Sequence, residues 1–97
     1  MQGRNGMGFC FPKGYKYCGP GCSGPGQPIN AVDAACREHD RCYKQHGGPS
    51  CACDKLFMKR LASEIDPYTK EGRDAHVLYQ YMKLQSFLGC GFQKRRG

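Results

Sequence analysis

Cysteine content constrains this chain more strongly than any other feature of its sequence. Eight cysteines stand in 97 residues, and a chain this short buries only a modest apolar core, so the even count predicts a domain held by disulfides. Disulfides persist in oxidising compartments, so we expect a secreted or otherwise extracytoplasmic protein. Zinc is the weaker alternative, because Cys51 and Cys53 are separated by one residue and no second close pair stands at finger spacing. Spacing alone does not choose the pairings among Cys10, Cys18, Cys22, Cys36, Cys42, Cys51, Cys53 and Cys90.

The net charge of +7 favours anionic partners, such as nucleic acid, an acidic protein or an acidic lipid surface. The basic residues are spread out and no recognition motif accompanies them, so we expect no nucleic-acid partner. No run of about twenty apolar residues is present, so no membrane span is expected. No charged and then apolar leader opens the chain, so a secreted form would have lost its signal or would use another export route.

The chain divides into a loop region at 1–28 and a helical region at 29–97, which together are expected to form a single domain over 1–97. Glycine and proline recur in the first region and interrupt any helix there. Capping residues and apolar periodicity predict three helices, and no convincing strand is indicated, so the expected fold is a mainly α, small disulfide-rich three-helix domain. The predicted helices cover about residues 29–46, 50–65 and 71–88.

The third predicted helix has one apolar face at helical spacing, and Gly89 is a natural stop for it. That face consists of Val77, Tyr81, Leu84 and Leu88.

The segment CREHDRCY, residues 36–43, places a histidine and an aspartate side by side between two cysteines. On a helix, Cys36, His39, Asp40 and Tyr43 share one face, while His39 and Asp40 diverge by about 100° and should meet different partners. A solvated polar pair is the ordinary alternative. The flanking cysteines favour a functional pair, because disulfides there would fix its backbone.

The segment YCGPGCSGPG, residues 17–26, is a glycine-rich loop before that helix. Glycine lets a chain turn with its carbonyls pointing inward, and calcium binds six to eight oxygens that include backbone carbonyls. A loop of this kind facing an aspartate is a candidate calcium site, although glycine loops that only turn are common.

The segment CACD, residues 51–54, places Asp54 at the start of the second predicted helix. If Cys53 bonds Cys42, the first two helices are clamped and the short loop between them makes them antiparallel. Asp54 and His39 could then meet across the groove, and a carboxylate that holds one imidazole nitrogen leaves the other free as a base. Alternatively, Asp54 simply stabilises the first turn of its helix.

These three segments, in this order, resemble the secreted phospholipase A2 family over residues 17–61, and most closely its compact forms such as the bee-venom type. Ala35 departs from the family pattern, which has a cysteine there, and Cys22 replaces a usual glycine or asparagine. The resemblance implies two antiparallel catalytic helices and an N-terminal glycine-rich calcium loop. It also implies the disulfides Cys18–Cys36 and Cys42–Cys53. Cys51 is then expected to pair with Cys90, which leaves Cys10 with Cys22, but the sequence does not decide the pairing of these last four.

The resemblance also assigns roles to individual residues. His39 matches the catalytic base, Asp54 the aspartate that orients it, and Asp40 the calcium-binding carboxylate. The remaining assignments are the calcium-binding carbonyls of Tyr17, Gly19 and Gly21, the Gly19 N–H in the oxyanion site, and Tyr81, or else Tyr79, as the tyrosine that bonds Asp54.

The activity implied is calcium-dependent hydrolysis of the sn-2 ester of glycerophospholipids. A monomer is expected, and the net charge of +7 favours an anionic phospholipid surface as its partner. Phe9, Phe11 and Ile29 are candidates for an acyl-chain groove, although packing in the core would explain them equally well. The alternative is a catalytically weak or inactive cationic membrane-binding protein or toxin on the same fold. The presence of His39, Asp40 and Asp54 together favours the enzyme.

Overall fold

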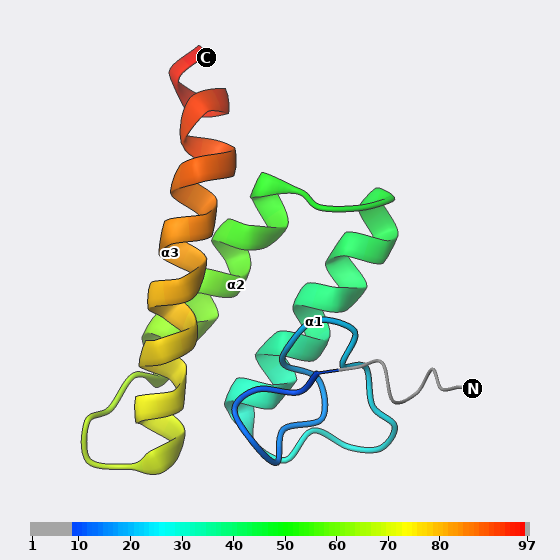
Figure 1. Cartoon of the computed structure of the whole chain (residues 1–97), viewed down its shortest axis with the longest axis vertical. Helices are drawn as coiled ribbons and strands as arrows, with labels where there is room; N and C mark the ends of the chain where they lie inside the picture. The colour runs from blue at the N-terminus through cyan, green and yellow to red at the C-terminus, as the bar shows by residue number, and fades with distance from the viewer. Residues whose placement is uncertain (1–8, 97) are drawn as a thin grey trace.

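The computed structural model describes the backbone of residues 9–96 and the side chains of residues 9–90. Three helices follow the loop region in the order α1 (Ala31–His46), α2 (Cys51–Glu64) and α3 (Lys70–Arg96), and no strand occurs in the described part. They run up, down and up, with α2 between the other two (Figure 1). The mainly α, three-helix prediction is therefore confirmed.

Helix α1 ends at His46 as predicted and begins at Ala31, two residues after the predicted start. The side chain of Asn30 accepts a hydrogen bond from the Asp33 amide at 2.8 Å, as an N-cap does. Gly47 then closes the helix with φ of 78°, a left-handed conformation that favours glycine.

Helix α2 runs antiparallel to α1 after a short connection over residues 47–50 (Figure 1). The hydroxyl of Ser50 accepts the Cys53 amide at 3.4 Å and caps the helix. The helix ends at Glu64, shortly before Asp66 and Pro67, where the proline disfavours a helical residue before it.

Helix α3 differs from its prediction in length. It passes through Gly89 and continues to Arg96, rather than ending near Leu88. A glycine inside a helix costs only about 1 kcal/mol, and the disulfide from Cys90 to Cys51 anchors the helix just beyond it. Tertiary structure therefore overrides the local stop signal.

The buried face of α3 is also not the apolar face that the sequence predicts. The predicted face is exposed, with Leu84 at 61% and Leu88 at 60%. In the first turn of α3, Gly72 packs so closely on the connection before the helix that a Cβ would lie 2.3 Å from the carbonyl oxygen of Asp66. The residues that α3 buries in the described part are Gly72, Ala75, Leu78, Met82 and Cys90.

The core lies where α1, α2 and α3 meet the loop region. Val32 of α1 and Leu61 of α2 are fully buried at its centre, and Phe57 packs beside them. No described helix is both long enough and apolar enough to cross a bilayer.

The four disulfides include the two pairs that the resemblance implies, and the remaining four cysteines pair as expected. The first disulfide lies within the loop region. The next three join the loop region to α1, α1 to α2, and α2 to α3. In that order they are Cys10–Cys22, Cys18–Cys36, Cys42–Cys53 and Cys51–Cys90.

Candidate active site

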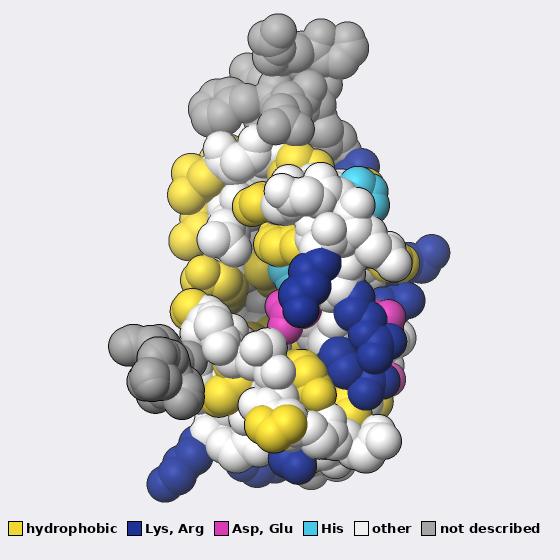
Figure 2. Space-filling model, turned by 90° about the vertical axis from the view of Figure 1, so that its right-hand side faces the viewer, with side chains coloured by type: hydrophobic (Ala, Val, Ile, Leu, Met, Phe, Trp, Pro, Cys, Tyr) yellow, Lys and Arg dark blue, Asp and Glu magenta, His cyan; other side chains and the backbone are white. Residues whose placement is uncertain are grey.

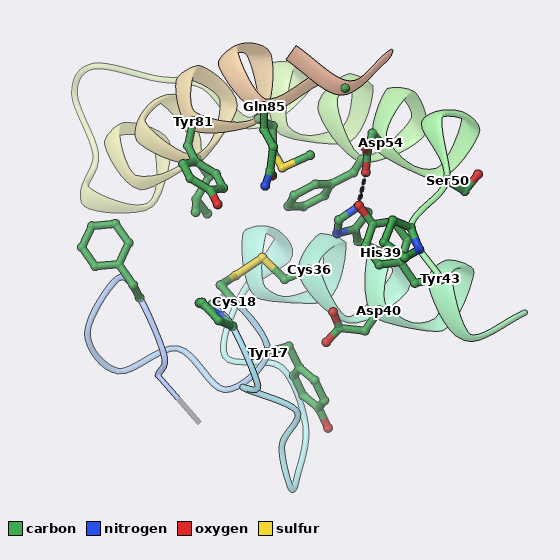
Figure 3. Close-up of a pocket in the computed structure, with 18 of the residues that line it drawn as sticks. Tyr17, Cys18, Cys36, His39, Asp40, Tyr43, Ser50, Asp54, Tyr81 and Gln85 are labelled. Carbon is green, nitrogen blue, oxygen red and sulfur yellow. Dashed lines mark hydrogen bonds and ion pairs between the residues drawn. A yellow bond between two sulfur atoms is a disulfide. The ribbon is translucent and has the colours of Figure 1, made fainter. Parts of the chain in front are cut away.

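His39 and Asp54 meet across the groove between α1 and α2. Nε2 of His39 lies 2.8 Å from Oδ1 of Asp54, and both side chains are mostly buried (Figure 3). The Cys42–Cys53 disulfide lies close by and holds the two helices together. Since Nε2 is engaged by the carboxylate, Nδ1 is the nitrogen left to accept a proton. The capping alternative for Asp54 is not supported, because Ser50 caps α2 and the Asp54 carboxylate contacts the imidazole.

A tyrosine does bond Asp54, but it is Tyr43 of α1 rather than the predicted Tyr81. The Tyr43 hydroxyl donates to Oδ1 of Asp54 at 2.5 Å. Burial, and then this hydrogen bond, raise the pKa of Tyr43, so its hydroxyl stays protonated and donating. Tyr81 is 57% exposed, and no described hydrogen bond joins it to Asp54. Tyr43 follows His39 by one helical turn, and this shared face was the signal that could have identified it.

Phe57 completes the surroundings of the histidine. Its ring stacks on His39 with centroids 4.3 Å apart and planes 13° apart. The ring of Tyr43 also contacts His39, in a tilted arrangement with centroids 4.3 Å apart. Together the two rings restrict the imidazole to one orientation.

The glycine loop lies beside α1 and is paired with the segment before it. The Phe9 amide donates to the Pro20 carbonyl at 2.8 Å, and the Phe11 amide donates to the Cys18 carbonyl at 2.9 Å. Gly19 between them has φ of 115°, and a Cβ there would lie 2.0 Å from the Phe9 carbonyl oxygen. Only glycine therefore fits at this position.

This pairing leaves the expected calcium-binding carbonyls largely free. Within residues 9–96, the carbonyls of Tyr17 and Gly21 accept no hydrogen bond, while the Gly19 carbonyl accepts the Cys22 amide at 3.1 Å and keeps a second lone pair. The Gly19 amide likewise has no acceptor among the described residues, so it can still donate to a ligand.

Asp33 fixes the loop from the first turn of α1, and the sequence analysis did not identify it. This fully buried carboxylate accepts the amide of Tyr17 at 2.8 Å, the amide of Ile29 at 3.0 Å and the amide of Lys16 at 3.1 Å. It thereby sets the backbone at Tyr17, one of the expected calcium ligands. Its position in the first turn after the Asn30 cap explains burial of a charge there, since the helix N-terminus stabilises an anion.

Asp40 projects from α1 on the side of the glycine loop, away from the His39–Asp54 pair (Figure 3). The predicted divergence of His39 and Asp40 is thus confirmed. Burial raises the pKa of the Asp40 carboxyl to about 6, partly offset by Lys44, and no described donor bonds the carboxylate. A half-buried carboxylate beside free backbone carbonyls is an all-oxygen donor set, which fits Ca²⁺ and disfavours zinc.

These groups share one cavity of about 1150 Å³. His39, Asp40 and Asp54 line it together with Phe9 and Phe11. In the space-filling view, apolar side chains gather along one side of the hollow that holds the acidic and histidine side chains (Figure 2). Ile29 does not line this cavity, because it lies ahead of α1 at the far end from His39, so its expected role in an acyl groove is wrong.

A nearby cluster of two cysteines and a histidine is not a metal site. Cys42, His46 and Cys53 lie close together, but both sulfurs belong to the Cys42–Cys53 disulfide and offer no thiolate.

The fold and the site define a small disulfide-linked α-helical protein with a histidine–aspartate pair beside an oxygen-rich loop. A family model described as the phospholipase A2-like domain matches residues 8–89, and the chain belongs to this family.

Curated relatives agree with this family. Phospholipase A2-beta of Arabidopsis thaliana is 36% identical over 64 residues, which are 64% of this chain and 43% of that protein. The acidic phospholipase A2 homolog taipoxin gamma chain of Oxyuranus scutellatus scutellatus is 52% identical over 43 residues, 44% of this chain and 26% of that one. Capsid protein VP1 of murine minute virus (strain MVM prototype) is 56% identical over 36 residues, 36% of this chain and 5% of that one.

The chain therefore spans less than half the length of these relatives. No solved structure gives a significant match. None of these relatives bears on the expected likeness to the bee-venom type, which stays a prediction.

Proposed function

We propose that this chain hydrolyses the sn-2 ester of glycerophospholipids in a calcium-dependent reaction, outside the cytoplasm and at an anionic phospholipid surface. One observation carries the proposal: a histidine oriented by Asp54 opens into the same cavity as Asp40 and the glycine loop. The four disulfides support the location.

The residues that would hold Ca²⁺ are Asp40 and the carbonyls of Tyr17, Gly19 and Gly21. The bound ion would supply positive charge for the lipid phosphate and for the ester carbonyl.

The protein's own groups account for the proton transfers. Nδ1 of His39 takes a proton from a water molecule as its oxygen attacks the ester carbonyl carbon. Asp54, itself fixed by Tyr43, keeps Nε2 protonated and stabilises the imidazolium that forms. The amide of Gly19 donates to the developing oxyanion. Collapse of the tetrahedral carbon breaks the bond to the sn-2 oxygen, which takes the proton from His39, and yields a fatty acid and a lysophospholipid.

Fatty-acid release from mixed phospholipid vesicles tests the proposal, with calcium and with chelator. Asp40→Asn should abolish calcium binding measured by calorimetry, together with release, because it removes the charged ligand. Glu38→Gln is the matched control, since it removes the same charge from an exposed position on α1 that pairs with Arg41.

Release that persists in chelator, or a normal calcium response in Asp40→Asn, would refute the proposed mechanism. Calcium binding without release by the unmutated protein would favour the non-catalytic membrane-binding alternative.

A further inference from the structure

The side chain of Tyr15 joins the loop region to the start of α3. Tyr15 is buried at 4% exposure, and its hydroxyl donates to Oδ2 of Asp74 at 2.8 Å. The exposed Lys70, one turn earlier on α3, bonds the same oxygen at 2.8 Å, and its Nζ lies 5.6 Å from the centroid of the Tyr15 ring. Among the described residues, no other hydrogen bond joins the loop region to α3.

The same hydroxyl is also joined to the start of α1. Nδ2 of Asn30 donates to the Tyr15 oxygen at 3.0 Å, while Oδ1 of Asn30 accepts the Asp33 amide at 2.8 Å. The Tyr15 hydroxyl therefore donates to α3 and accepts from the N-cap of α1. Both of its hydrogen-bonding roles are satisfied inside the protein, so the loop is fixed to two helices at one atom.

This hydroxyl lies two residues before an expected calcium ligand. The next two amides, those of Lys16 and Tyr17, donate to the Asp33 carboxylate, and Cys18 is bonded to Cys36 of α1. Consecutive residues on both sides of the Tyr17 carbonyl are thus held by side chains of the helices. Because each residue has only two soft backbone dihedrals, these contacts fix the direction in which that carbonyl points.

The Tyr15–Asp74 hydrogen bond also joins two walls of the cavity. Tyr17 and Gly19 line the cavity from the loop region, while Leu78, one turn after Asp74, lines it from α3 together with Tyr81. Tyr17 and Tyr81 lie on opposite sides of the pocket (Figure 3). Loss of this bond would free the glycine loop to move relative to α3.

We propose that Tyr15 and Asp74 are positioning residues that hold the glycine loop in its calcium-binding form. They act through Asn30, Asp33 and the loop backbone, and they do not themselves bind the ion. The consequence for calcium rests on the proposed function, whereas the hold on the loop does not. If Tyr15 only packed in the core, its hydroxyl would be dispensable.

Tyr15→Phe tests the hold on the loop, because it removes the hydroxyl and keeps the ring. Amide hydrogen exchange is measured on the calcium-free protein, where the amides of Tyr17 and Cys22 report on the loop through their bonds to Asp33 and Gly19. Both amides should exchange on the order of tenfold faster or more, while the amides of α2 exchange as in the unmutated protein. Tyr79→Phe is the matched control, since Tyr79 packs on the core and its hydroxyl bonds no described residue.

Variants of Asp74 separate positioning from packing. Asp74→Ala removes the acceptor of the Tyr15 hydroxyl, whereas Asp74→Asn keeps one acceptor oxygen. By calorimetry, Tyr15→Phe and Asp74→Ala should bind calcium about tenfold more weakly, and Asp74→Asn should largely restore the affinity. Because both residues act through one hydrogen bond, Tyr15→Phe/Asp74→Ala should bind calcium no more weakly than either single variant.

Unchanged exchange of the loop amides in Tyr15→Phe would overturn the proposal, and so would an equal acceleration across α2. Faster exchange in the loop with unchanged calcium affinity would also overturn it, because the loop would then bind calcium without this hold. If the unmutated protein bound no calcium, the proposed function would be refuted, while selective acceleration in the loop would still support the hold by Tyr15 and Asp74.

Discussion

Replacing Asp33 with asparagine should loosen the glycine loop while keeping the size of the side chain. One carboxylate oxygen alone accepts the Tyr17 amide, the other alone accepts the Ile29 amide, and Lys16 donates to both. Asparagine keeps one acceptor oxygen, and its NH₂ group faces a backbone amide that can only donate. Either the bond to the Tyr17 amide or the bond to the Ile29 amide is therefore lost.

The magnitude follows from those bonds. A hydrogen bond to a charged acceptor contributes about 1.5–3 kcal/mol and a neutral one about 0.5–1.5 kcal/mol. Losing one bond and the charge on the other should therefore lower the free energy of unfolding by about 3 kcal/mol. Because Asp33 also sets the backbone at an expected calcium ligand, calcium affinity should fall about 10- to 100-fold, as for other outer-shell groups.

Urea unfolding, followed by circular dichroism with the disulfides intact, measures the stability, and calorimetry measures calcium binding. The control is Asp66→Asn, whose carboxylate accepts one backbone amide, that of Tyr68, at an exposed turn. If Asp33→Asn unfolded within about 0.5 kcal/mol of the unmutated protein, the buried carboxylate would not be stabilising the loop.

Three other predictions concern neighbouring parts of the structure. Tyr43→Phe should lower the rate of hydrolysis but leave calcium affinity unchanged, because it removes only the hydroxyl that fixes Asp54. Kinetics and calorimetry on the same variant check this, and a shifted calcium affinity would contradict it. Replacing Cys42 and Cys53 with serine should lower the free energy of unfolding by about 2–5 kcal/mol, and activity should fall with it. Full activity at native stability would show that the Cys42–Cys53 disulfide is not needed. Burial raises the pKa of Tyr15 to about 12, above its ordinary value of 10, so the neutral form favours the folded state, and stability should be lost as pH rises between these values. Unfolding measured across that range, with Tyr15→Phe for comparison, should show a weaker pH dependence in the variant.

The active-site pair could be predicted from spacing because it depends on local geometry. His39 and Asp54 each lie within a helical turn of a cysteine that joins the two helices, so one disulfide hypothesis brings them together. The ends of α1 could be predicted for the same reason, since Asn30 and Gly47 each form a capping hydrogen bond with their own helix.

The wrong or missing predictions concern α3, the tyrosine that bonds Asp54, and Asp33, whose places depend on contacts with other parts of the chain. Apolar residues occupy two faces of α3, and periodicity alone does not say which face is buried. In the structure, the face of Ala75, Leu78 and Met82 is the one that packs on the core. Tyr81 was assigned from the family resemblance of its segment, which did not show that Tyr43 is the tyrosine that bonds Asp54. Asp33 was missed because its partners are backbone amides, which leave no side-chain pattern in the sequence.

In the proposed mechanism, His39 is the base of a hydrolytic site whose calcium is held by other residues. His39→Gln tests it most directly, with His76→Gln as the control, since His76 is an exposed histidine on α3. Fatty-acid release with calcium and calcium affinity by calorimetry are measured on both variants and on the unmutated protein. We expect His39→Gln to bind calcium with unchanged affinity and to release almost no fatty acid, while His76→Gln behaves like the unmutated protein. Full release by His39→Gln would contradict it.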